Sequence, residues 1–295
     1  MSGVRLWVMA ARPRTLPAAV APVFVGTAVA VAAVDSLRVG AFIAALLGSI
    51  FIQIGTNLAN DYSDAKRGAD AVDRLGPVRV TAAGLVAPRR VLAATWIAFG
   101  VAVAAGVYLT VLAGPIILAV GAASIVAGVL YTGGPKPYGY EGLGEVFVFV
   151  FFGLVAVNGS YFVQVEQLDL LPAALSVLIG LLTSAILVVN NVRDMDTDKR
   201  AGKRTLAVRV GRRRARLVFE TLVVASFVGL PIALLVGDGS AWGLLALISL
   251  PLAVGPIVAV RNREDGASLN IALAGTGRLL GAYSVLLSAG LLIGS

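Results

Sequence analysis

Cysteine and histidine are both absent from the 295 residues of the sequence. Without cysteine there are no disulfide bonds and no thiol nucleophiles, and without histidine there is no imidazole base and no usual zinc site. Charged residues make up only 14% of the chain, against about 25% in soluble domains. Hydrophobic residues make up 58%, and the mean hydropathy is +0.91. This composition disfavours a water-soluble fold, and any chemistry has to use Asp, Glu, Lys, Arg, Tyr, Asn and Ser.

Long apolar runs fill most of the chain. A transmembrane helix needs about 20 mostly apolar residues, and runs of that length predict an all-α integral membrane protein whose helices form a bundle around a central cavity. The runs number nine, and the predicted spans are Thr15–Val34, Val39–Asn60, Val91–Leu112, Ala113–Tyr131, Gly144–Val163, Leu171–Asn191, Leu217–Val236, Ala241–Val260 and Ile271–Ile293.

The basic residues fall on one side of these spans. With a cytoplasmic N-terminus, 22 of the 24 Lys and Arg lie in segments on the cytoplasmic side, as the positive-inside rule requires. The net charge of +8 therefore reflects membrane topology and not a nucleic-acid partner. The expected location is the cytoplasmic (plasma) membrane. The two long polar loops, 61–90 and 192–216, are predicted to cap a site that faces the cytoplasm.

Two matching polar motifs end the second and sixth apolar runs. The first is Asn57-x-x-x-Asp61 and the second is Asn190-x-x-x-Asp194, 133 residues later. Residues three or four apart share one face of a helix, so Asp64 is expected to join the first set, and Asp198 joins the second if the helix continues that far. Four spans separate the motifs, which predicts two repeated four-helix units plus one further helix.

The motifs combine oxygen ligands with cations. Carboxylates at a membrane boundary are costly unless they are paired or bind a metal ion, and clusters of Asp and Asn oxygens suit Mg²⁺ that also binds phosphate. Mixed charges in one loop usually form a solvated surface, but two matched copies favour a Mg²⁺–diphosphate site. The roles of Asp70, Asp73 and Asp196 stay open. The basic residues among the motifs are Lys66, Arg67, Arg193, Lys199, Arg200, Lys203 and Arg204.

The motifs and their flanking segments resemble the UbiA superfamily of intramembrane aromatic prenyltransferases. Within it, they are most similar to the branch that prenylates 1,4-dihydroxy-2-naphthoate in menaquinone biosynthesis. The superfamily pattern has an Asp four residues after Asp64, where this chain has Gly68, and the naphthoate branch shares this difference. The matching segments are ARPRTLPAAVAPVFVGTA, QIGTNLANDYSDAKRGAD, GPVRVTAAGL, GEVFVFVFFGLVAVNGSYFVQ and NNVRDMDTDKRAGKRTLAVRVG.

The resemblance implies one transmembrane prenyltransferase domain over residues 1–295. It also implies Mg²⁺-dependent transfer of a polyprenyl group from polyprenyl diphosphate to 1,4-dihydroxy-2-naphthoate, with decarboxylation to demethylmenaquinol. Asp61, Asp64, Asp194 and Asp198 would be catalytic metal ligands, together with Asn57 and Asn190. The residues expected to bind the diphosphate are Arg14, Lys66, Arg67, Lys136, Arg193 and Lys199.

An allylic cation needs a dry, aromatic-lined chamber. Tyr138, Tyr140, Phe147 and Phe149 are candidates for its walls, and the polyprenyl tail is expected to leave sideways between helices into lipid. Asn158 lies inside an apolar span, where it either contacts the acceptor or joins two helices. The residues predicted for the acceptor or prenyl pocket are Tyr62, Tyr131, Asn158 and Tyr161.

Other functions remain possible from the sequence. Internal repeats and polar residues in spans also occur in secondary transporters, although here the acids gather at one side. CDP-alcohol phosphotransferases use Asp clusters with Mg²⁺, but their single Asp-rich block is missing. The same chemistry could also serve 4-hydroxybenzoate, homogentisate or a phospholipid ribose as acceptor.

Overall fold

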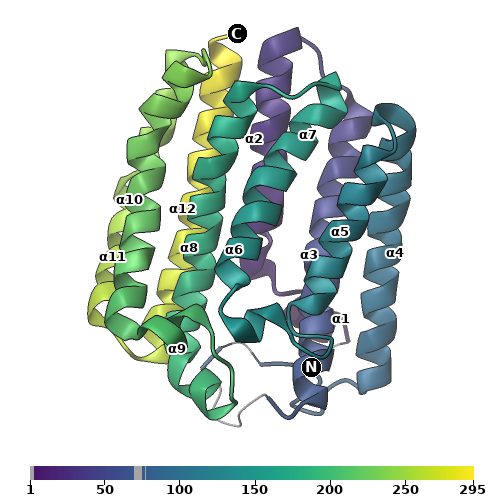
Figure 1. Ribbon diagram of the computed structural model, residues 1–295, viewed down its shortest axis with the longest axis vertical. Coiled ribbons are helices and arrows are strands. Elements are labelled where there is room, and N and C mark those ends of the chain that lie inside the picture. The colour runs from purple at the N-terminus through teal and green to yellow at the C-terminus, as the bar shows by residue number, and fades with distance from the viewer. Residues whose placement is uncertain (1–2, 70–74, 77) are drawn as a thin grey trace.

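The protein is a bundle of long, roughly parallel and antiparallel helices (Figure 1). The computed structural model describes residues 3–69, 75–76 and 78–295, so Asp70 and Asp73 lie outside the described residues. The described part contains no strand. Its elements are α1 Gly3–Ala11, η1 Pro13–Thr15, α2 Pro17–Val34, α3 Val39–Lys66, α4 Pro88–Ala113, α5 Ile116–Leu130, η2 Tyr138–Glu141, α6 Gly144–Val148, η3 Phe149–Val155, α7 Ala156–Val165, α8 Leu170–Arg200, α9 Leu206–Val210, α10 Arg212–Val236, η4 Ala241–Ser249, α11 Pro251–Asn262 and α12 Gly266–Ile293.

Local sequence signals explain several helix ends. Pro17 and Pro88 start α2 and α4 at positions where a missing N–H costs nothing. The side chain of Asp265 caps α12 by accepting a hydrogen bond from the Ser268 N–H at 2.8 Å. Gly114, with φ of 92°, turns the chain between α4 and α5. The chain therefore turns close to the predicted boundary between the third and fourth apolar runs, Val91–Leu112 and Ala113–Tyr131.

Fewer than the nine predicted membrane spans have the length and hydropathy that a crossing requires, in the part of the chain that the structure describes. In the described part of the chain, seven helices are long and apolar enough to cross a membrane, and the bent pair η4 and α11 makes an eighth if it is one span. The remaining predicted span is α5, which has only 15 residues. The protein is thus a multi-pass, all-helical membrane protein.

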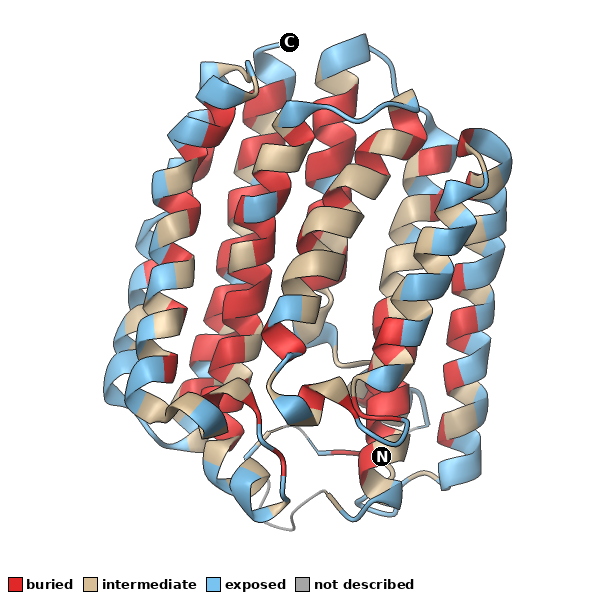
Figure 2. Ribbon diagram, in the orientation of Figure 1, coloured by how far each residue is buried: buried red, intermediate tan, exposed pale blue. Residues whose placement is uncertain are grey.

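Helix α8 forms the centre of the bundle. It packs against α10, η3, α12, α2, α7 and α6, and Figure 2 shows it among the most buried helices. Gly153 of η3 meets Gly180 of α8 so closely that an added Cβ on Gly153 would lie 2.5 Å from the Gly180 Cα. Since only glycine permits this approach, the pair fixes the π-helical η3 against α8.

Helix α5 is attached differently. Among the described elements it packs extensively only against α3 and α4. Figure 1 shows it beside α6, with η3 and α7 continuing the same line. The helical bundle therefore has a loosely packed seam between α5 and the α6–η3–α7 segment.

Candidate active site

A cavity of about 340 Å³ lies among α2, α3, α4, α5, η3 and α8. The end near the last turns of α3 and α8 is lined by charged and amide side chains, and we call it the polar end. The opposite part is lined by aliphatic and aromatic side chains of α4, α5 and η3. The lining residues of the polar end are Asn57, Asn60, Asp64, Arg79, Tyr140, Asn190, Asn191, Asp194, Asp198 and Lys203.

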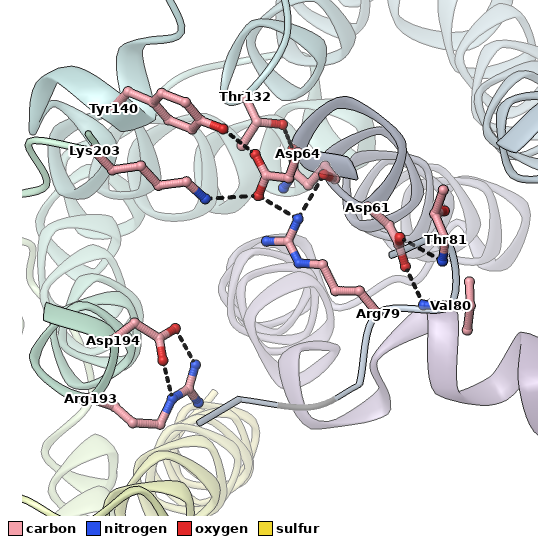
Figure 3. A network of polar contacts seen from close by, with 11 residues as sticks. Asp61, Asp64, Arg79, Val80, Thr81, Thr132, Tyr140, Arg193, Asp194 and Lys203 are labelled. Carbon is pink, nitrogen blue, oxygen red and sulfur yellow. Dashed lines mark hydrogen bonds and ion pairs between the residues drawn. The ribbon is translucent and has the colours of Figure 1, made fainter. Parts of the chain in front are cut away.

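Asp64 is the most enclosed carboxylate of the polar end, with no exposed surface. It forms ion pairs with Arg79 and with Lys203, whose Nζ lies 3.0 Å from its Oδ2, and it accepts a hydrogen bond from the Tyr140 hydroxyl (Figure 3). Arg79 also donates to the carbonyl oxygen of Asn60 at 2.8 Å. Asp64 therefore connects four chain segments: the end of α3, the 78–87 segment, η2 and the turn after α8.

Tyr140 is held in its neutral form. Burial first, and then the nearby Asp64 carboxylate, raise the pKa of the Tyr140 hydroxyl well above its usual value. The hydroxyl consequently stays protonated at neutral pH and donates to Asp64. The Lys203 ammonium lies 4.8 Å from the centre of the Tyr140 ring, a cation–π contact that further fixes the lysine.

Asp61 has a different role in the described geometry. Its carboxylate accepts hydrogen bonds from the backbone N–H groups of Val80 at 2.9 Å and Thr81 at 3.1 Å (Figure 3). It is buried and does not line the cavity. These bonds fix the loop that carries Arg79, so Asp61 places that guanidinium next to Asp64.

The second motif forms another wall of the same cavity. Asp194 receives two hydrogen bonds from Arg193, at 2.8 and 2.6 Å. The Arg193 guanidinium also donates to Asn190 at 2.8 Å and to Asn270 of α12 at 2.9 Å. Arg193 itself does not line the cavity, so it orients Asn190 and Asp194 from behind. Helix α8 continues to Arg200, which puts Asp198 on the same cavity face.

Comparison with known proteins identifies this arrangement. The model of the UbiA prenyltransferase family matches residues 19–288. The chain belongs to the UbiA prenyltransferase family. It is 42% identical over 285 residues to the 1,4-dihydroxy-2-naphthoate octaprenyltransferase of Mycobacterium leprae, covering 97% of this chain and 95% of that protein. It is 38% identical over 265 residues to the enzyme of the same name from Escherichia coli, covering 86% and 84%.

Solved structures of UbiA homologues share the fold. The apo homologue from Aeropyrum pernix K1 has a TM-score of 0.66 at 14% identity and covers 99% of both chains. A homologue from Archaeoglobus fulgidus bound to DMAPP and Mg²⁺ has a TM-score of 0.62 at 13% identity and covers 96% of this chain and 99% of that one. At these identities the similarity concerns the UbiA fold alone.

The polar end suits Mg²⁺ that is shared with a ligand. Among the described residues, no three acidic side chains come close enough to enclose an ion by themselves. Mg²⁺ commonly takes one or two carboxylates and completes its shell with water and substrate phosphate. The cavity supplies oxygen donors of that kind on two walls: Asn57 and Asp64 from α3, and Asn190, Asp194 and Asp198 from α8. The residues therefore fit a UbiA metal that is bound together with a diphosphate.

The structure separates the predicted site residues into two groups. Six of them line the cavity: Asn57, Asp64, Tyr131, Asn190, Asp194 and Asp198. The others have different surroundings, and their predicted roles stay predictions. The cations Arg14, Lys66, Arg67, Lys136 and Lys199 are exposed, and Arg67 donates to the Gly134 carbonyl. Asn158 of α7 donates a hydrogen bond to the Leu154 carbonyl of η3 at 2.7 Å. Tyr161 lies in the core, and Tyr62 packs beside Leu58 and Val80.

The polar residues of the cavity that the sequence prediction did not assign to the site include Asn60, Arg79, Asn191 and Lys203. Asn60 and Asn191 each lie beside a predicted motif residue and share a helical turn with it. Arg79 lies inside the segment GPVRVTAAGL, which supported the family resemblance without suggesting a role for the arginine. Lys203 was one of several basic residues in its loop. In each case the residue type can be read from the sequence, but the direction in which its side chain points cannot.

Proposed function

We propose that this UbiA-family chain is a Mg²⁺-dependent 1,4-dihydroxy-2-naphthoate polyprenyltransferase of menaquinone biosynthesis, acting as one domain over residues 1–295. The observation that carries the proposal is the cavity itself, which joins a cluster of carboxylates and cations to an apolar, aromatic wall. A polyprenyl diphosphate has the same division into a charged head and an apolar tail. The naphthoate acceptor is inferred from the names of the relatives at 38–42% identity.

The diphosphate would bind at the polar end. Arg79 and Lys203 are the buried cations there, and both are held in place by Asp64. Asp64, Asp194 and Asp198, with Asn57 and Asn190, would hold the metal. When bound, Mg²⁺ supplies positive charge that makes the diphosphate a better leaving group. Arg79 and Lys203 would hydrogen-bond the phosphate oxygens and stabilise the negative charge that grows as the allylic C–O bond breaks.

The acceptor needs little help from a base. A dihydroxylated ring is already a strong carbon nucleophile, which agrees with the absence of histidine. Its carboxylate-bearing carbon would form the new C–C bond as the C–O bond to diphosphate breaks. Loss of CO₂ then returns the electron pair to the ring and restores aromaticity. The chain's part in this step is to exclude water and to hold the ring beside the allylic carbon.

The tail would lie along the seam between α5 and η3. One face of α5 lines the cavity with Ile117, Val120, Gly121 and Ser124. Facing it, α6 and η3 contribute Phe147, Val148, Phe151, Phe152 and Val155. Since α5 packs extensively only on α3 and α4 among the described elements, this seam is the side on which a long tail can pass from the cavity into lipid.

Gly121 tests the tail route. An added Cβ on Gly121 would have no atom within 4 Å, so a side chain can start there without a clash and would extend into the seam. We expect Gly121→Phe to lower kcat/KM about tenfold or more with an octaprenyl diphosphate and less than threefold with geranyl diphosphate. Gly255→Phe, in equally open space on α11, is the matched control. Equal loss with both substrates would place the tail elsewhere.

We infer that the polar end faces the cytoplasm and that the protein lies in the plasma membrane with a cytoplasmic N-terminus. Arg79 and Lys203 belong to the segments 61–90 and 192–216, which together carry most of the basic residues of the chain. Basic segments between membrane spans remain on the cytoplasmic side. Labelling of single cysteines introduced into this cysteine-free chain would test the orientation.

The decisive experiment is prenyl transfer by the purified protein. It uses Mg²⁺, a polyprenyl diphosphate and 1,4-dihydroxy-2-naphthoate, with an EDTA arm and 4-hydroxybenzoate as a second acceptor. A Mg²⁺-dependent, decarboxylated prenyl-naphthol is the expected product, and EDTA should abolish it until Mg²⁺ is restored. Product from hydroxybenzoate alone would overturn the acceptor and keep the chemistry. Absence of both turnover and diphosphate binding would overturn the whole proposal.

A further inference from the structure

Glu145 is a carboxyl group that the proposed chemistry does not use. It lies in the first turn of α6, it is 9% exposed, and it does not line the cavity. Its Oε1 accepts a hydrogen bond from Nδ2 of Asn191 at 2.7 Å. Its Oε2 is buried and has no hydrogen-bond partner among the described residues. Burying an oxygen without a hydrogen-bond partner is costly, and a simple link between α6 and α8 does not require it.

Asn191 is the link from Glu145 to the cavity. It is 4% exposed and lines the cavity beside Asn190. Its amide nitrogen is engaged by Glu145, while its carbonyl oxygen accepts no hydrogen bond in the described part of the chain and is not enclosed by protein atoms. Oε1 accepts both in the ionised carboxylate and in the acid protonated at Oε2, so the amide presents its NH₂ to Glu145. The Asn191 carbonyl is thereby left for the cavity.

The position of Asn191 relative to the polar end matches an acceptor ring. Asn191 precedes Asp194 by three residues on α8, about one helical turn or ~5 Å further from the Asp198 end. An allylic carbon sits within a few ångströms of the diphosphate oxygen that it leaves, so the attacking ring must lie at this level. Tyr131 also lines the cavity near Asn191. Its ring lies against Gly144, the neighbour of Glu145.

We propose that Glu145 is a positioning residue that orients the Asn191 amide, so that the Asn191 carbonyl oxygen accepts a hydrogen bond from a ring hydroxyl of the aromatic acceptor. The inference rests on the proposed function and deepens it, because it assigns the acceptor end of the cavity. A phenolic hydroxyl is a group that a carbonyl acceptor without a protein partner can recognise, because an acceptor molecule that lacks the hydroxyl would leave that carbonyl unpaired.

The test separates acceptor recognition from a purely structural link. We would measure kcat and both KM values in Asn191→Ala, Glu145→Leu and Glu145→Gln, and acceptor binding without prenyl diphosphate by titration. Asn191→Ala and Glu145→Leu should raise the acceptor KM and dissociation constant about tenfold, with the KM for prenyl diphosphate unchanged. Glu145→Gln keeps a carbonyl acceptor for the Asn191 amide and should stay within about twofold of wild type.

Ser184→Ala is the matched control. Ser184 of α8 donates to the Glu145 carbonyl oxygen at 3.1 Å, so this variant removes a second α6–α8 bond and leaves the Asn191 amide oriented. It should keep the wild-type acceptor KM. Thermal unfolding in detergent identifies any variant that fails to fold. If one of the two disruptive variants fails, the acceptor titration with the other, compared with Glu145→Gln, carries the result.

Two outcomes would overturn the inference: equal rises in both KM values, or an unchanged acceptor KM in Asn191→Ala. Failure of the proposed function is a separate result, because it would appear in the wild-type protein as lack of transfer to the naphthoate. If wild type prenylates 4-hydroxybenzoate instead, the same variants measured with that phenol still decide whether Asn191 binds the ring hydroxyl.

Discussion

Replacing Asp64 by asparagine is expected to lower prenyl transfer by about a thousandfold. The change removes a proposed metal ligand, and it also leaves Arg79 and Lys203 without the carboxylate that holds them. Breaking a buried ion pair by removing one partner costs about 3–5 kcal/mol. Activity and thermal unfolding of Asp64→Asn in detergent, with and without Mg²⁺ and diphosphate, would measure both effects.

Asp196→Asn is the matched control for Asp64. Asp196 pairs with Arg212 at 2.8 Å, but its side chain is 69% exposed, and exposed pairs contribute little. We expect activity within about twofold of wild type and an unchanged unfolding temperature. Comparable losses in the two variants would mean that general charge balance, and not the buried cluster, supports turnover.

The second large effect is expected for Arg79. Arg79→Met should lower kcat/KM for the polyprenyl diphosphate about a hundredfold, because it removes the forked donor nearest to Asp64. Arg79→Lys should recover part of this loss, since it keeps the charge but not the fork. The measurement is steady-state kinetics with each substrate varied, and the acceptor KM should be unaffected.

Lys203 and Lys199 provide a comparison for the same hypothesis. Lys203 is buried and lies 3.0 Å from Asp64, whereas Lys199, four residues earlier, is exposed. Lys203→Met should reduce diphosphate binding in the manner of Arg79→Met, and Lys199→Met should leave it near wild type. A greater loss of diphosphate binding in Lys199→Met than in Lys203→Met would support the sequence prediction, which assigned Lys199 to the diphosphate. It would contradict the proposal based on the cavity, which assigns Lys203.

The motif residues on regular helices could be predicted from the sequence because helical spacing fixes their direction. Asn190, Asp194 and Asp198 follow one another at intervals of four, and α8 remains helical to Arg200, so all three face the cavity. Asn57 and Asp64 reach it in the same way from α3. Helical periodicity was sufficient for these five residues.

Two other residues, Asp61 on α3 and Lys203 after α8, could not be predicted in this way, because their surroundings depend on tertiary contacts. Asp61 shares the helical face of Asn57, yet the returning chain presents the N–H groups of Val80 and Thr81 to it. Lys203 turns inward because Gly202, with φ of 73°, ends the helix and the Lys203 N–H bonds the Asp198 carbonyl at 2.8 Å. No repeat in the sequence encodes either contact.

Helix α8 is longer than a bilayer crossing requires. Its 31 residues extend about 46 Å, and about 20 of them suffice for the hydrocarbon layer. The surplus is the end that carries Asn190, Asp194 and Asp198, so the charged part of the reaction takes place where lipid gives way to water. In the proposed reaction the two products would leave into different phases: diphosphate would depart into water beside Asp198, and the prenylated ring would remain in the lipid. Partition in opposite directions would keep the products apart and so oppose the reverse reaction.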